Sequence, residues 1–159
     1  MGQQSNSRRK HPHAPVASAV DSPLGDHFFF YLTQLEHTFR TSIELSLEEF
    51  ALDIRQYTAL AFIVDGHAPT QYELGHLLRL DPSQVVTLTK GLVNRGLLTR
   101  HTLERDRRAK ALTITADGRR LYAQAALTVR HVEESLTAAL SRRDHVALRV
   151  LLDRILPRP

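Results

Sequence analysis

The sequence predicts a mainly α-helical fold that carries one small β-hairpin. Apolar residues recur at spacings of three and four along most of the chain, as on the buried face of an amphipathic helix. Residues that favour helix starts precede several of these segments. After Gly96 the helical pattern gives way to two short segments of Leu, Ala, Thr and Ile separated by a charged stretch, which is typical of a hairpin.

The composition sets the class of protein. The chain has 159 residues, of which 42% are hydrophobic and 24% charged, a balance that suits a globular domain with its own core. It has no cysteine, which excludes disulfides, thiolate zinc sites and thiol nucleophiles. No apolar run is long enough for a membrane span, and the first ten residues lack the apolar stretch of a secretory signal. We therefore expect a soluble, cytoplasmic protein.

A flexible arm and two helices are expected before residue 70. Residues 1–22 are rich in Ser, Gln, Pro, Ala and basic side chains without a helical period, which favours a flexible basic arm. The apolar stripe over residues 28–43 predicts one long helix. Asp53 and Gln56 have the spacing of a capping box, and the helix that they start is expected to end at Gly66.

Two short helices with strong start signals follow. Thr70 and Glu73 have the pattern of a full capping box, and Asp81 followed by Pro82 provides a cap and a first helical residue for the next helix. A tight turn separates the two, which predicts a helix-turn-helix arrangement. The side chains expected to face inward are Leu74, Leu77, Leu78, Val85, Leu88 and Leu92.

The last third of the chain is expected to form the hairpin and two further helices. Strands are predicted over residues 97–100 and 111–114. Thr115 is a candidate cap for a helix that runs towards Leu136, and Ser141 for a last helix that Pro157 ends.

Charge is concentrated around the hairpin. Residues 95–120 hold eight basic against three acidic residues, a net charge of +5 in a chain whose formal net charge is +4. A charged stretch is often only a solvated loop, but one basic segment on a mildly acidic body is also typical of a face that meets a polyanion.

Three motifs carry a resemblance to a known family. They are Gly-Leu-Val-Asn-Arg-Gly-Leu-Leu-Thr-Arg at 91–100, Asp-Arg-Arg-Ala-Lys at 106–110 and Leu-Thr-Ile-Thr-Ala-Asp-Gly at 112–118. On these motifs the chain resembles, from about residue 24 to 156, the MarR family of winged helix-turn-helix transcriptional regulators. The resemblance implies a winged helix-turn-helix with long N- and C-terminal dimerisation helices.

This resemblance also implies an organisation and a function. Residues 23–50 would form the N-terminal dimerisation helix, 51–118 the winged helix-turn-helix DNA-binding domain, and 119–159 the C-terminal dimerisation helices. The expected protein is a bacterial, homodimeric transcriptional repressor that binds a pseudo-palindromic double-stranded DNA operator. Two-fold symmetry would place its recognition helices roughly 34 Å apart.

The recognition helix would be residues 82–95. Gln84 and Thr87 are expected to hydrogen-bond base edges, Val86 to meet a thymine methyl group, and Lys90 to reach a guanine or a phosphate. Gln84 is equally suited to cap the helix with Asp81, and the family often has Arg where Thr87 stands. The complete set of expected DNA contacts is Thr70, Pro82, Ser83, Gln84, Val86, Thr87, Lys90, Arg95, Arg105, Asp106, Arg107 and Arg108.

The other contacts have distinct expected roles. Arg107 and Arg108, at the tip of the hairpin, would enter a minor groove, while Asp106 would pair with an arginine and fix the tip. Thr70 and Arg95 are candidates for phosphate contacts, although Thr70 also suits a plain helix cap.

Many relatives bind a small phenolic or aromatic acid, and Arg40, Tyr57 and Phe62 are candidates to hold such an effector here. One alternative is a metal-responsive regulator whose zinc ligands are histidines and carboxylates. The side chains considered for it are His11, His13, His27, Glu36, His37, His131 and Glu134. Another alternative is an architectural protein that binds any duplex. Because enzyme motifs are absent from the sequence, we expect neither catalysis nor a cofactor.

Overall fold

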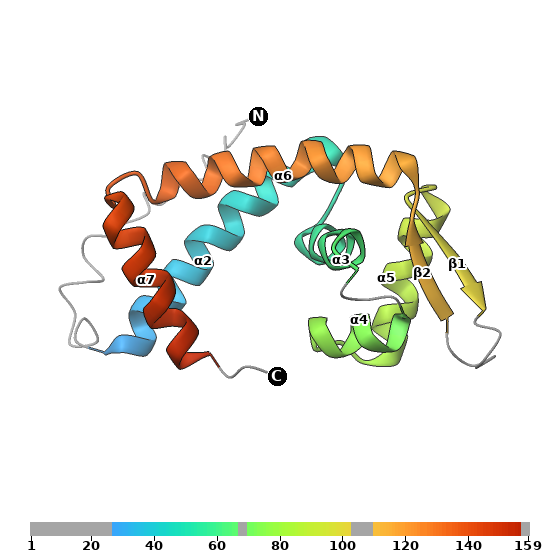
Figure 1. Ribbon diagram of the computed structural model, residues 1–159, viewed down its shortest axis with the longest axis horizontal. Helices are drawn as coiled ribbons and strands as arrows, with labels where there is room; N and C mark the ends of the chain where they lie inside the picture. The colour runs from blue at the N-terminus through green and yellow to red at the C-terminus, as the bar shows by residue number, and fades with distance from the viewer. Residues whose placement is uncertain (1–26, 67–69, 103–109, 157–159) are drawn as a thin grey trace, which may run out of the picture. The chain divides into compact units, whose positions relative to one another are not determined.

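The computed structural model describes residues 27–66, 70–102 and 110–156. These residues form helices and one two-stranded antiparallel sheet, which confirms the predicted mainly α fold with a β-hairpin (Figure 1). In chain order the elements are α2 (Phe28–Leu47), η1 (Glu48–Phe50), α3 (Ile54–Val64), α4 (Gln71–Leu78), α5 (Pro82–Asn94), β1 (Leu98–Thr102), β2 (Lys110–Ile114), α6 (Ala116–Leu136) and α7 (Arg142–Ile155).

The helix starts follow the capping residues that the sequence predicts. Asp53, Thr70, Asp81 and Ser141 each accept a hydrogen bond from the third residue of their helix, whose side chain bonds back to the cap's backbone N–H. Thr115 caps α6 through the N–H of Gly118, at 2.9 Å. These caps satisfy donors that the first turn of a helix leaves without partners, so each helix start is fixed locally.

The chain divides into two compact units, residues 1–38 and 39–159. In the first unit the structure describes residues 27–38, which contain the first turns of α2. The large apolar side chains on these turns are exposed to solvent, namely Phe28, Phe29, Tyr31, Leu32 and Leu35.

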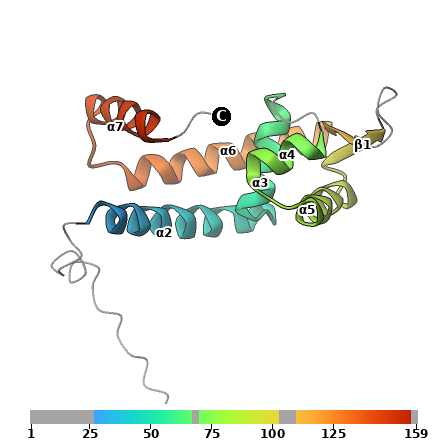
Figure 2. The same cartoon turned by 90° about the horizontal axis from the view of Figure 1, so that it is seen from below.

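The core of the second unit lies where α3 meets its neighbours. This helix contacts α4, α5, α6 and β2, and Figures 1 and 2 show it beside α4 and α6. Its Leu60 is completely buried, as are Leu47, Leu74 and Leu92 from three other helices. Burial of a leucine side chain stabilises a fold by about 1.5–3 kcal/mol, so this cluster fixes how the helices pack.

Helices α4 and α5 pack closely at two points. Gly75 on α4 leaves no room for a side chain, because an added Cβ would lie 2.9 Å from Cγ2 of Val85 on α5. Near the start of α4, the amide of Gln71 donates to the hydroxyl of Thr89, which is fully buried and itself donates to the carbonyl of Val85 at 2.8 Å. The angle between the two helices is thereby set by both shape and hydrogen bonding.

The inward faces differ in detail from the predicted ones. Leu74 is buried as expected, but Leu77 is 37% exposed and belongs to the outer side of α4. Thr89 is buried although it is polar, because Gln71 and its own helix supply its hydrogen bonds. On α3 the buried residues are Ala59, Leu60 and Ile63.

Helix α7 has no buried residue. Its apolar side chains Leu148, Leu151 and Ile155 follow one face at spacings of three and four, and they are 43%, 52% and 60% exposed. Among the described residues, no helix is long and apolar enough to cross a membrane.

Candidate nucleic-acid interface and effector pocket

The outer face of α5 carries a continuous row of exposed side chains. Val85, Thr89 and Leu92 turn into the core. The row on the opposite side consists of Ser83, Val86, Thr87, Lys90 and Asn94. A helix whose inner face is anchored by a second helix and whose outer face is polar and unobstructed has the form that enters a major groove.

Polar groups at the start of α5 already have partners. The Oδ1 atom of Asp81 accepts hydrogen bonds from the N–H of Ser83, at 2.9 Å, and of Gln84, at 3.0 Å. These hydrogen bonds, with one from the Ser83 hydroxyl at 2.6 Å, hold the pKa of Asp81 below its usual value. The helix N-terminus is therefore occupied by a carboxylate, which disfavours a phosphate at the same place.

Two of the expected base-reading side chains also make local hydrogen bonds. The side-chain carbonyl of Gln84 accepts from the N–H of Asp81 at 3.2 Å, so Gln84 performs the capping role that the sequence left open. The hydroxyl of Thr87 donates to the carbonyl of Ser83 at 3.0 Å and keeps its lone pairs for an external donor. Val86 is 46% exposed and offers an apolar surface between them.

The hairpin stands beside this helix, and β1 packs against α5. Its register pairs Leu98 with Ile114 and ends with Thr102 opposite Lys110, whose ammonium donates to the Thr102 hydroxyl at 2.8 Å. An isolated bridge between Thr70 and Ala111 ties the start of α4 to β2. The expected contacts Arg105, Asp106, Arg107 and Arg108 lie outside the described residues.

The remaining predicted contacts, Thr70 and Arg95, are engaged within the protein. The Thr70 hydroxyl donates to the Glu73 carboxylate at 2.7 Å and accepts from the Glu73 N–H at 3.2 Å. The Arg95 guanidinium donates to the carbonyls of Ala51, at 2.5 Å, and Phe50, at 2.9 Å. Pro82 occupies the first position of α5, where it is exposed.

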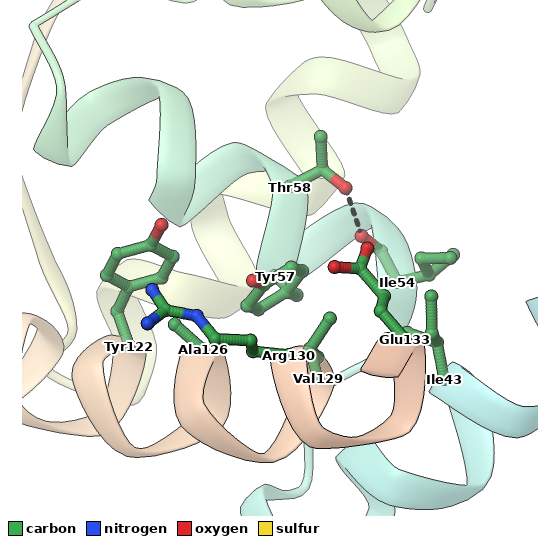
Figure 3. A pocket seen from close by; sticks show the side chains of 9 residues that line it. All are labelled: Ile43, Ile54, Tyr57, Thr58, Tyr122, Ala126, Val129, Arg130 and Glu133. Carbon is green, nitrogen blue, oxygen red and sulfur yellow. Dashed lines mark hydrogen bonds between the residues drawn. The ribbon is translucent and has the colours of Figure 1, made fainter. Parts of the chain in front are cut away.

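A pocket of about 330 Å³ lies between α3 and α6 (Figure 3). Two aromatic rings in it, Tyr57 and Tyr122, stack with centroids 5.6 Å apart and planes inclined by 28°. Opposite charges stand near its rim on α6, where Arg130 and Glu133 extend towards α3. The other lining residues are Ile43, Ile54, Thr58, Ala126 and Val129.

The phenol groups in this pocket are held in their neutral form. Burial, reinforced by Tyr122 and the charge of Glu133, raises the pKa of Tyr57 to about 12, although Arg130 opposes the shift. Burial also raises the pKa of Tyr122. Stacked neutral rings beside one guanidinium can hold a flat aromatic molecule and orient an acidic group on it.

Comparison with known proteins identifies the family. A family model described as MarR family matches residues 52–109. The fold is similar to that of a MarR family transcriptional regulator from Rhodococcus sp. RHA1, with a TM-score of 0.76, 27% identity, and coverage of 83% of this chain and 94% of that one. Residues 52–109 match the MarR family, and the fold of the chain is similar to that of MarR-family regulators. A comparison with curated protein sequences finds no match.

Two further structures of MarR-type fold hold ligands. The transcriptional repressor CouR bound to a 23-mer DNA duplex has a TM-score of 0.77 to this chain, with 25% identity and coverage of 83% of this chain and 94% of the other. CouR from Rhodococcus jostii RHA1 bound to p-coumaroyl-CoA has a TM-score of 0.73, with 26% identity and coverage of 83% and 93%.

The structure brings only some of the predicted effector residues together. Tyr57 lines the pocket, whereas Arg40 pairs with Glu44 on α2 at 3.8 Å and Phe62 packs against the core. Neither of these two is among the lining residues of this pocket.

Residues that sequence reasoning missed come from α6 and from the end of α5. The residues of α6 that line the pocket follow one another at helical spacings, so this stripe of charged, aromatic and small apolar side chains could have indicated the pocket from the sequence. They are Tyr122, Ala126, Val129, Arg130 and Glu133. Asn94 shares the outer row of α5 and was identifiable from its spacing to Thr87 and Lys90.

The histidines give no metal site in the part of the chain that the structure describes. No three His, Asp or Glu side chains lie close enough there to hold an ion. The two arm histidines of the zinc alternative, His11 and His13, lie outside that part.

Proposed function

We propose that this MarR-family transcriptional regulator is a homodimeric repressor that binds a pseudo-palindromic operator and releases it when a small aromatic acid enters the pocket. The exposed row on α5 carries the proposal. It is held by α4 from behind and flanked by the hairpin, so its side chains point away from the protein as a unit. Such an arrangement supports reading of base edges rather than catalysis.

In the proposed complex, Val86, Thr87 and Lys90 read the major groove, and Asn94 extends the row. Arg107 and Arg108 enter the adjacent minor groove, with Arg105 on the neighbouring phosphates and Asp106 fixing the tip. The basic balance of residues 95–120 supports this placement, because a duplex repels any acidic face.

The operator is found by selection from a random duplex library with the purified protein. Specific regulators prefer their site over random duplex by about 10³-fold or more at physiological salt. Equal affinity for both duplexes, with a steep salt dependence, would support the architectural alternative instead.

Substitutions can distinguish what the hairpin tip contributes to DNA binding from what α5 contributes. Arg108→Ala should weaken binding to operator and random duplex alike and reduce the slope of log affinity against log salt by about 0.9. Val86→Ala and Thr87→Ala should leave that slope unchanged. They should change the binding free energy by which one base pair is preferred over another, by about 1–3 kcal/mol at single positions of the operator. The opposite assignment of effects would contradict the proposed docking.

A second copy of the chain is the partner proposed for α7. Its stripe of Leu148, Leu151 and Ile155 is exposed in the single chain, and a row of this kind on a helix with no buried residue favours association. Sedimentation should give a dimer for the natural protein and a monomer for Leu151→Glu. Arg149→Glu, a charge reversal elsewhere on the same helix, is the matched control and should stay dimeric.

The effector is proposed to stack on Tyr57 and Tyr122 and to place its carboxylate near Arg130. p-Coumarate is the first probe, titrated into the protein bound to its operator. Release of the duplex should require about tenfold more ligand in Arg130→Gln, whereas Arg142→Gln on α7 should behave as the natural protein does.

Repression itself is measured with a reporter gene whose promoter overlaps the operator. A rise in transcription on adding the protein would contradict the proposed repression.

A further inference from the structure

The C-terminal end of the recognition helix is attached to the turn between α2 and α3. Arg95 is the C-cap residue of α5, and its backbone N–H donates a hydrogen bond to the carbonyl of Gly91. Its two terminal nitrogens reach the consecutive carbonyls of Phe50 and Ala51, 45 and 44 residues earlier in the chain. We call this double hydrogen bond the Arg95 clamp.

The turn that receives the clamp is itself firmly placed. Leu47 and Leu52 at its two ends are buried, and the N–H of Leu52 closes it by donating to the carbonyl of Leu47 at 3.2 Å. The Glu49 carboxylate accepts a hydrogen bond from Thr128 on α6 at 3.4 Å. The turn thus belongs to the rigid part of the second unit.

The carbonyls of Phe50 and Ala51 suit a planar cation. They lie at the C-terminal end of η1, the negative end of a helix, and Ala51 has a left-handed backbone with φ 50°. Among the described residues, no backbone N–H donates to either oxygen. A guanidinium donates along two directions at once, whereas the ammonium of a lysine is a point donor.

The fully buried anchors of α5 end at Leu92. Val85, Thr89 and Leu92 are buried, but Asn94 and Arg95 are exposed at its end. The N–H of Leu97 also donates to the Leu92 carbonyl at 3.0 Å, and the clamp adds a side-chain attachment at the exposed end of the helix beyond Leu92. Because base contacts need side chains placed within about 0.5 Å, the freedom of this end matters for reading DNA.

We infer that Arg95 is a positioning residue, which ties the recognition helix to the α2–α3 turn, and that it does not contact a phosphate. The inference rests on the proposed function, since it concerns the residue's effect on operator reading. It changes the role expected for Arg95 from the sequence, because one N–H from each terminal nitrogen of the guanidinium is bound to a protein carbonyl, which fixes the direction of the side chain.

The test compares Arg95→Lys, which keeps the charge, with Arg95→Gln, which removes it. Arg55→Lys, at an exposed arginine on α3, is the matched control. Affinities for the selected operator and for a scrambled duplex are measured by fluorescence anisotropy over a range of salt concentrations, with thermal unfolding of each variant in parallel.

A positioning role predicts that both substitutions weaken operator binding by about tenfold, leave binding to the scrambled duplex unchanged and preserve the salt slope. A phosphate contact predicts that Lys retains affinity within about twofold, while Gln lowers the slope by about 0.9 on both duplexes. That second result overturns the inference. Lower thermal stability with unchanged operator affinity overturns it too, because it shows a purely local role.

Amide hydrogen exchange gives a readout that needs no DNA. Exchange at Ala51 and Leu52, whose N–H groups close the turn, should accelerate in both Arg95 variants and stay unchanged in Arg55→Lys. Unchanged exchange in the Arg95 variants overturns the clamp. If the natural protein prefers no duplex, the proposed function fails, and the exchange data still decide whether the clamp exists.

Discussion

At the scale of single residues, close contacts and burial decide which positions tolerate change. Gly118 lies in the first turn of α6, where an added Cβ would collide with the carbonyl oxygen of Leu97 and lie 3.0 Å from Cγ1 of Ile114. Gly91, in the last turn of α5, has only the end of the flexible Gln56 side chain within 4.0 Å of such an atom. Gly118 is therefore required for close packing, whereas the space around Gly91 would admit a side chain.

Gly118→Ala should destabilise the protein by about 1–3 kcal/mol, because the start of α6 must move away from the strand entrance. Gly91→Ala, the matched control, should stabilise it by up to about 1 kcal/mol through the higher helix propensity of alanine. Urea unfolding of both variants checks the pair. If both substitutions change the free energy of unfolding by the same small amount, the end of the hairpin must move enough to accommodate the added methyl group.

The buried phenol of Tyr57 gives a second prediction at this scale. Its folded pKa of about 12 exceeds the ordinary value of 10.0, so folding favours the neutral form. The resulting stabilisation is fully present below pH 10 and is lost as pH rises towards 12. Ultraviolet titration should show a late tyrosinate step that Tyr57→Phe removes. A titration in which that substitution removes only an ordinary step near pH 10 would contradict the buried assignment.

At the scale of elements, ionised caps fix where the helices begin. Asp81 caps α5, and Asp144 completes the capping box of α7. Hydrogen bonds from Ser83 and Ser141 respectively, each the largest cause, lower the pKa values of these two carboxyl groups. Helix α5 therefore owes its start to a charge as well as to its apolar face.

Acid should release both caps. Because the folded pKa values lie below the ordinary 3.8, the stabilisation is present above that pH and is lost as pH falls through the folded values. Urea unfolding at pH values on both sides of 3.8 measures this loss. Asp81→Asn keeps a capping side chain without the charge, so it should be less stable than the natural protein at neutral pH and lose less on acidification. An identical acid loss in both proteins would exclude Asp81 as a contributor.

At the scale of the whole molecule, a single chain leaves much apolar surface in solvent. The exposed large side chains include Phe28 and Phe29 on α2, and Leu151 and Ile155 on α7. In the proposed homodimer, association would cover such faces and add to the stability of the chain.

The midpoint of thermal unfolding should therefore rise with protein concentration, as mass action requires for a dimer that unfolds to monomers. Scans over a hundredfold range of concentration test this. Leu151→Glu should lower the midpoint and remove its concentration dependence. A midpoint that is independent of concentration in the natural protein would contradict the dimer.

The sequence by itself determined the helix starts, the helix-turn-helix and the hairpin, because capping, turn residues and apolar period act over three or four residues. It also carried the motifs from which the MarR family was recognised. The tertiary structure decided the partners that lie far apart in the chain. It buried Thr89 against Gln71, placed Tyr122 over Tyr57, and turned Arg95 inward to carbonyls more than forty residues away. Such contacts depend on how helices pack, which short spacings along the chain do not encode.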